Sequence, residues 1–244
     1  EIHGNNFSAV SNAIIEFNRK IIDAVHDIVP AVKPNIALYE CYGAEGMKAF
    51  VDTVHYAKKK GLIVIEDGKK NDIGSTAQAY AEGHLGVVTL ADGSIAAAID
   101  ADAMTLNPYL GRDSLEPFVG VCKNRGKGIF ILCKTSNPSS KDVQDINVGD
   151  SRVYEIVAKI IYELGYENEG NSGYSFVGAV VGATFPEQAR KIRNILQKSI
   201  FLVPGYGAQG GTAKETIPCF NKDGYGAIIN SSRDIIFAYK KMNK

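Results

Sequence analysis

The sequence predicts an α/β fold, a TIM (β/α)8 barrel, because amphipathic helices alternate with short apolar segments from one end to the other. Seven such segments begin mostly about 25 residues apart, which is the spacing of repeated strand–loop–helix units. The length of 244 residues also suits one barrel, which typically takes roughly 250 residues. We therefore expect a single barrel domain over residues 1–244.

The seven segments are predominantly apolar, as is typical of strands buried on both faces of a parallel sheet. They lie at 32–38, 62–66, 103–106, 129–133, 176–181, 200–203 and 226–229. The chain enters a helical pattern almost at once, so no strand precedes the first helix. We expect the first strand of the barrel to lie upstream of Glu1, missing from the given chain.

Three helical stripes are clear, with apolar residues recurring at spacings of three and four. They run from Val10 to Val25, from Met47 to Val54 and from Val153 to Leu164. The competing fold is a doubly wound open sheet, but no GxGxxG motif follows a first strand. Two long connections, 83–101 and 134–151, are expected to be insertions, since loops of that length in a compact domain usually serve function or are disordered.

Composition and charge exclude several classes of function. Lys plus Arg and Asp plus Glu both number 27, so there is no overall positive field to attract nucleic acid or an anionic membrane. The longest apolar segments have four to six residues, against the roughly 20 that a membrane-spanning helix needs. The four cysteines form no CxxC pair, which argues against zinc and a disulfide framework and favours a reducing, cytoplasmic location.

The segment 62–66 ends in an unusual group of charges, with Asp67 and Lys69 on one face of the strand and Asp72 in the following loop. Lys33 and Asn35 share one face of the preceding segment, and Asp67 could pair with Lys33. The simplest alternatives are a solvated charged turn and an exposed edge lysine. Charges that end a buried strand are costly unless paired, and such clusters gather at functional sites.

Two later segments have the features of a phosphate site. Residues 204–211 contain four glycines and Gln209, and glycine lets backbone amides approach an anion. After the last apolar segment, Ser231 or Ser232 could cap a helix whose first turn carries Arg233. Because a cation is unfavourable at a helix N-terminus, a bound anion would explain Arg233. In barrels the loops after strands seven and eight often bind phosphate, although a flexible turn is the alternative for 204–211.

The segment KTSNP at 134–138 offers Thr135, Ser136 and Asn137 to the edge of a polar heterocycle, or forms a simple turn before Pro138. The histidines fall in helical or terminal segments, which argues against a histidine general base; they are His3, His26, His55 and His84. No GxSxG or GxxxxGK[ST] motif is present, which argues against a serine hydrolase and a P-loop enzyme.

The sequence DGKKNDI at 67–73 resembles the Asp-x-Lys-x-x-Asp-Ile signature of the orotidine 5′-phosphate decarboxylases. Together with KTSNP, PGYGAQGG and NSSR it is similar to the type 2 branch of that family, from the first helix to the last. The resemblance implies decarboxylation of orotidine 5′-monophosphate to UMP by a homodimeric barrel, with no metal or organic cofactor. Two alternatives are a metal-dependent sugar-phosphate decarboxylase or synthase of the same superfamily and a non-catalytic nucleotide-binding barrel.

The resemblance also implies roles for individual residues. The catalytic charged tetrad is implied to be Lys33, Asp67, Lys69 and Asp72. Lys69 would protonate C6 of the pyrimidine, and Asp72 would reach into the active site of the partner subunit. The family's aspartate at the end of its first strand has no counterpart before the first helix here.

The implied substrate-binding residues fall into three groups. Asn35, Ile73 and Thr76 would line the ribose and base pocket, the last two from the partner subunit. Ser136 would bind the pyrimidine edge, and Pro204 would shape the pocket. The phosphate would be held by Gln209, Ser232 and Arg233. The loops 134–151 and 204–211 are candidate lids.

Overall fold

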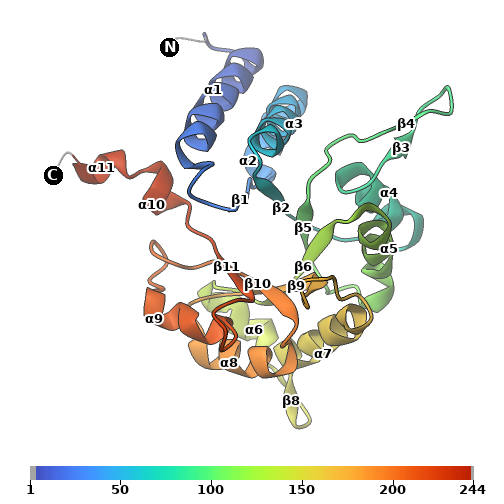
Figure 1. Ribbon diagram of the computed structural model, residues 1–244, viewed down its shortest axis with the longest axis vertical. Coiled ribbons are helices and arrows are strands. Elements are labelled where there is room, and N and C mark those ends of the chain that lie inside the picture. The colour runs from blue at the N-terminus through green and yellow to red at the C-terminus, as the bar shows by residue number, and fades with distance from the viewer. Residues whose placement is uncertain (1–3, 243–244) are drawn as a thin grey trace.

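Seven parallel strands form one curled sheet, surrounded by helices, in the computed structural model, which describes residues 4–242 (Figure 1). The strands are β1 Ala31–Val32, β2 Ile63–Lys70, β5 Ala103–Leu106, β6 Gly128–Lys134, β9 Ser175–Val181, β10 Ser199–Val203 and β11 Ala227–Ile229. They lie side by side in chain order and every ladder between them is parallel. This order has no reversal, so the barrel prediction is confirmed and the doubly wound alternative is wrong.

The sheet is open on one side. Its order starts at β1 and ends at β11, and among residues 4–242 no ladder joins these two strands. The gap between them is where an eighth strand would close the barrel. His3 lies outside the described residues.

The five central strands are largely buried on both faces, as predicted, whereas the edge strands β1 and β11 are only partly buried. The inner face contributes a small apolar cluster of Ile65, Ala103, Phe130, Val180 and Leu202. The outer face packs on the helices in a much larger cluster that includes Val64, Met104, Ile131 and Phe201. Alternate residues of each strand therefore enter different cores, which explains why the strands read as continuous apolar segments.

The longer helices pack around the outside of the sheet (Figure 1). They are α1 Phe7–Val25, α3 Gly43–Lys59, α4 Gly74–His84, α5 Glu116–Arg125, α7 Val153–Tyr166 and α8 Pro186–Ile195. The three predicted stripes correspond to α1, α3 and α7. Short helices of four residues complete the set: α2 Ala37–Glu40, α6 Lys141–Gln144, α9 Ala213–Thr216, α10 Arg233–Ile236 and α11 Tyr239–Met242. Within residues 4–242 no helix combines the length and apolar character needed to cross a membrane.

The strand expected at 32–38 is much shorter than predicted, because β1 ends at Val32. Pro34 has no N–H to donate to a ladder. Asn35 then forms a single bridge with Asp67, and its side chain accepts a hydrogen bond from the amide of Ala37 at the start of α2. The apolar residues 36–38 thus belong to a helical turn.

The two insertions contain regular structure that the sequence did not indicate. Residues 83–101 include the hairpin of β3 Val88–Thr89 and β4 Ile95–Ala96, which projects from the body in Figure 1. Residues 134–151 include α6 and a second small hairpin, β7 Asn147–Val148 with β8 Ser151–Arg152. Strands of two residues are too short to give a periodic pattern.

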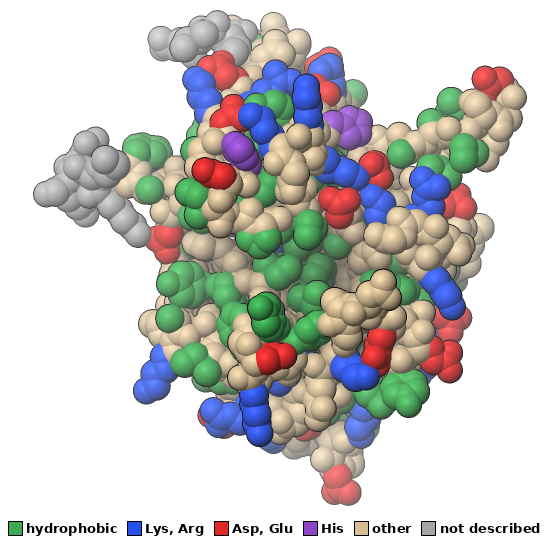
Figure 2. All heavy atoms as spheres, viewed as in Figure 1, with side chains coloured by type: hydrophobic (Ala, Val, Ile, Leu, Met, Phe, Trp, Pro, Cys, Tyr) green, Lys and Arg blue, Asp and Glu red, His purple; other side chains and the backbone are tan. Residues whose placement is uncertain are grey.

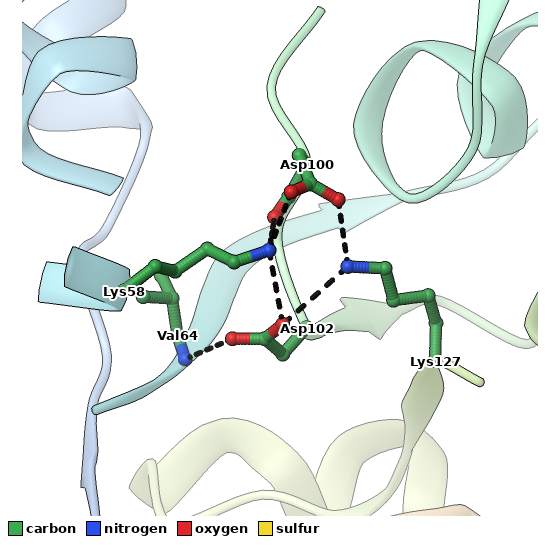
Figure 3. Close-up of polar contacts among 5 residues, drawn as sticks. All are labelled: Lys58, Val64, Asp100, Asp102 and Lys127. Carbon is green, nitrogen blue, oxygen red and sulfur yellow. Dashed lines mark hydrogen bonds and ion pairs between the residues drawn. The ribbon is translucent and has the colours of Figure 1, made fainter. Parts of the chain in front are cut away.

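The amino-terminal ends of three strands are joined by a charge network (Figure 3). Lys58 contacts Asp100 at 2.5 Å and Asp102 at 3.2 Å, and Lys127 contacts the same two carboxylates at 2.7 and 3.4 Å. The second oxygen of Asp102 accepts the amide of Val64 at 2.9 Å. Burial raises the pKa of Asp100, but the two ammonium groups outweigh it and the pKa lies below its ordinary value. The network fixes the end of the sheet opposite the site described next.

Candidate active site

A pocket of about 540 Å³ lies at the carboxyl ends of the strands, where barrels place their ligand sites. Its volume is in the range of small-molecule sites. Figure 2 shows apolar side chains gathered over the centre of the sheet, with charged side chains around the rim. The pocket is lined by Lys33, Asp67, Lys69, Thr105, Leu132, Thr135, Ser136, Asn137, Ser139, Ser140, Val143, Gln144, Val180, Leu202, Pro204, Gln209 and Asn230.

Asp67 is the centre of the charged part of the pocket. Its side chain is buried, and each carboxylate oxygen contacts a different ammonium group, Oδ2 that of Lys33 and Oδ1 that of Lys69. Burial raises the pKa of Asp67, and the two lysines more than offset this, so the pKa lies below its ordinary value. Asp67 is therefore ionised at neutral pH and balances one of the two positive charges. The predicted pairing of Asp67 with Lys33 is confirmed.

The backbone at Lys69 is distorted in a way that places its side chain. Lys69 has φ of 49°, in the left-handed region that costs a non-glycine residue about 1–3 kcal/mol. The β2–β5 register also shifts here, since Glu66 pairs with Met104 but Lys70 pairs with Leu106. Such bulges re-aim side chains beside active sites. As a result Lys69 and Asp67 meet on the inner side of the sheet.

Thr105 supports the distortion from the neighbouring strand. Its Oγ1 accepts the amide of Lys69 at 2.9 Å and donates to Asp67 Oδ1 at 3.2 Å. The side chain of Lys69 remains 46% exposed, so its ammonium faces the pocket while the carboxylate holds it from behind.

The loop after β6 forms the opposite wall of the pocket, with Thr135, Ser136 and Asn137. The carbonyl of Ser136 accepts the hydroxyl of Thr184 at 2.9 Å. Gly182 packs so closely that an added Cβ would lie 2.7 Å from the Cα of Ser136. The absence of a side chain at Gly182 therefore allows the loop to sit against β9.

The glycine-rich segment 204–211 borders the pocket through Pro204 and Gln209. The amides of Gly207, Gly210 and Gly211 donate to carbonyls within the segment, at 2.8, 2.8 and 3.0 Å. These three N–H groups thus stabilise the turn, and the predicted use of the glycine amides for an anion does not hold for them. Gln209 is the polar side chain that this segment presents to the pocket.

The family follows from the match of a family model, described as the Orotidine 5′-phosphate decarboxylase / HUMPS family, to residues 13–243. The chain belongs to this family. It is 48% identical to an orotidine 5′-phosphate decarboxylase of Rhodopirellula baltica, over 96% of this chain and 76% of that protein. It is 46% identical to the one of Clostridium novyi, over 97% and 79%. The solved structure of Leishmania donovani OMP decarboxylase is similar as well, with 33% identity, a TM-score of 0.74, and 98% and 86% coverage.

The pocket brings together six of the twelve residues that the family signature implicates: Lys33, Asp67, Lys69, Ser136, Pro204 and Gln209. Asn35 lies just behind them, with its amide 3.5 Å from Asp67 Oδ2. The other five lie outside the lining of this single chain: Asp72, Ile73, Thr76, Ser232 and Arg233.

Those five residues lie in two exposed segments. Asp72, Ile73 and Thr76 surround the start of α4, where Asp72 Oδ1 accepts the amide of Ile73 at 2.8 Å. Ser232 occupies the N-cap position of α10 but makes no side-chain capping bond, contrary to the expected cap. Arg233 is exposed at the first residue of that helix.

Sequence reasoning did not select Thr105, Gln144 or Asn230, which also line the pocket. Thr105 follows Ala103 by two, so strand alternation could have placed it inward beside Asp67. Gln144 had no such signal, because its position depends on the fold of the 134–151 insertion. His84 lies in a helix, as expected, since it is the last residue of α4; its Nδ1 contacts the buried carboxylate of Glu66 on β2 at 2.7 Å.

Proposed function

We propose that this chain catalyses the decarboxylation of orotidine 5′-monophosphate to UMP, a carboxy-lyase reaction of pyrimidine biosynthesis. The observation that carries the proposal is the buried Asp67 with the ammonium groups of Lys33 and Lys69 on its two oxygens, at the mouth of the barrel. Membership of the decarboxylase family and 48% identity to a curated decarboxylase support it. One barrel domain over residues 1–244 carries this activity.

In the proposed reaction the bond between C6 and the carboxyl carbon breaks and its electron pair stays on C6. That carbanion has little delocalisation, so a fixed positive charge close to C6 lowers the barrier. Lys69 supplies this charge and then the proton that forms the C6–H bond as carbon dioxide leaves. Asp67 holds the Lys69 ammonium in position through the ion pair between them. Water restores the proton to Lys69 after product release.

The remaining pocket residues bind the unreacting parts of the substrate. Ser136 binds the edge of the pyrimidine, Asn35 the ribose, and Pro204 shapes the pocket beside them. Gln209 with Ser232 and Arg233 holds the phosphate. Binding energy from a phosphate remote from C6 can hold the closed, reactive state.

Arg233→Ala tests the phosphate assignment. The side chain is exposed at the first residue of α10, so the fold should be unaffected. We expect the KM for orotidine 5′-monophosphate to rise by about tenfold or more, since a charge-assisted bond to phosphate is lost. Steady-state kinetics measure this, and an unchanged KM would refute the role of Arg233.

The active unit in this proposal is a homodimer in which Asp72, Ile73 and Thr76 of one subunit enter the site of the other. Ile73 is 56% exposed in the single chain, so its side chain is available to a second copy. A second copy would bury Ile73, and the neighbouring Asp72 would complete the charged tetrad of that copy. We also propose a cytoplasmic location, in agreement with bacterial relatives and with four free cysteines.

The rival reaction is that of a metal-dependent sugar-phosphate enzyme of the same family. Lys33 opposes a cation beside Asp67, and among residues 4–242 no group of three or more His, Cys, Asp or Glu side chains could hold a metal ion. The test is the loss of orotidine 5′-monophosphate absorbance with purified full-length protein, with and without EDTA. We expect turnover that EDTA does not change. Turnover that EDTA abolishes would favour the rival, and UMP binding without turnover would favour a non-catalytic barrel.

A further inference from the structure

Lys134, at the end of β6, is a fully buried lysine that the proposed reaction does not use. Its ammonium donates to Asp145 Oδ1 at 2.9 Å and to Ser140 Oγ at 3.0 Å, and it lies 4.3 Å from the ring centre of Phe185. Asp145 is the one carboxylate that pairs with it among the described residues. A buried charge that loses its partner is strongly unfavourable.

Both partners of Lys134 belong to the segment 135–145, which forms one wall of the pocket. Seven residues of this segment line the pocket: Thr135, Ser136, Asn137, Ser139, Ser140, Val143 and Gln144. The segment is tied to itself a second time, because Gln144 accepts the amide of Thr135 at 2.9 Å and donates to its hydroxyl at 2.8 Å. The two ends of the segment are therefore joined by the Lys134–Asp145 ion pair and by two hydrogen bonds between Thr135 and Gln144.

We propose that the Lys134–Asp145 pair is a positioning device that holds segment 135–145 closed over the pocket and so sets the affinity for the pyrimidine nucleotide. The proposal rests on the proposed function of the site. If the segment opens, Asp145 and Ser140 move away and leave the ammonium without partners in an apolar environment. Opening the segment is therefore unfavourable because it breaks a buried ion pair. Residues of the segment such as Val143 are exposed and stabilise the closed arrangement less.

The test compares Asp145→Asn with Asp142→Asn, a matched change at an exposed aspartate of the same segment. In Asp145→Asn we expect the KM for orotidine 5′-monophosphate and the Kd for UMP to rise about tenfold or more, with a smaller change in kcat. Backbone amides of 135–145 should exchange hydrogen faster than in the native protein. Asp142→Asn should match the native protein in each of these measurements.

A second variant separates an unpaired charge from a lost contact. Lys134→Met removes the ammonium but keeps a chain of similar length against Phe185, so in the Asp145→Asn background it should restore part of the affinity and of the exchange protection. A double variant at least as defective as the sum of the two single changes would overturn the proposal. So would native KM and native exchange in Asp145→Asn. If the native protein itself shows no turnover, the proposed function fails, while the exchange comparison still tests the Lys134–Asp145 pair.

Discussion

Replacing Lys69 by alanine is expected to lower kcat by about 10³-fold or more, because in the proposed reaction Lys69 is both the charge that stabilises the C6 carbanion and its proton donor. The side chain is nearly half exposed, and among residues 4–242 it forms an ion pair only with Asp67. The loss of turnover should therefore come without unfolding. Alanine also fits the left-handed backbone at this position no worse than lysine does.

The neighbouring Lys70 is the matched control. Its ammonium pairs with Glu40 at 2.6 Å, and it does not line the pocket. Lys70→Ala should keep kcat within a few-fold of the native value. Kinetics and circular dichroism of the two variants measure the contrast. A Lys69→Ala protein with near-native kcat would contradict its role as the proton donor.

Asp72→Asn is expected to lower kcat by roughly 10²-fold or more, since in the proposed dimer the partner site loses the second carboxylate that flanks Lys69. Asparagine keeps the oxygen that accepts the amide of Ile73, so the turn before α4 should survive. Size-exclusion chromatography should show an unchanged oligomer. Steady-state kinetics of the variant and the native protein measure the change in kcat. A native kcat would refute a role for Asp72 in catalysis.

Most of the strands were predictable, because a strand that is buried on both faces has a nearly continuous apolar sequence. The strand at 103–106 is observed at Ala103–Leu106, and its residues enter the inner and outer cores in turn. The strand predicted at 32–38 was too long. The segment contains Pro34, which cannot donate to the ladder, and β1 ends at Val32. The small hairpins in the insertions were missed because their pairing is local and their strands have only two residues.

The charged part of the site was predictable for a similar reason. Asp67 and Lys69, at the end of a buried strand, are charges that need partners, and Lys33, directly after β1, supplies one. The bulge at Lys69 and the hydrogen bond from its amide to Thr105 depend on backbone geometry. No pattern in the sequence indicates that geometry. Contacts across a subunit interface cannot be derived from periodicity, so the position of Asp72 rests on resemblance to the family.

The charged tetrad is tested most directly by mixing the Lys69→Ala and Asp72→Asn proteins, each nearly inactive alone, and measuring turnover of orotidine 5′-monophosphate after subunit exchange. If Asp72 completes the site of the partner subunit, each hybrid dimer contains one native site. With random exchange, the equal mixture should then recover about a quarter of native activity. If both residues act in the same subunit, no hybrid contains a native site. A mixture that stays as inactive as its components would contradict the shared tetrad.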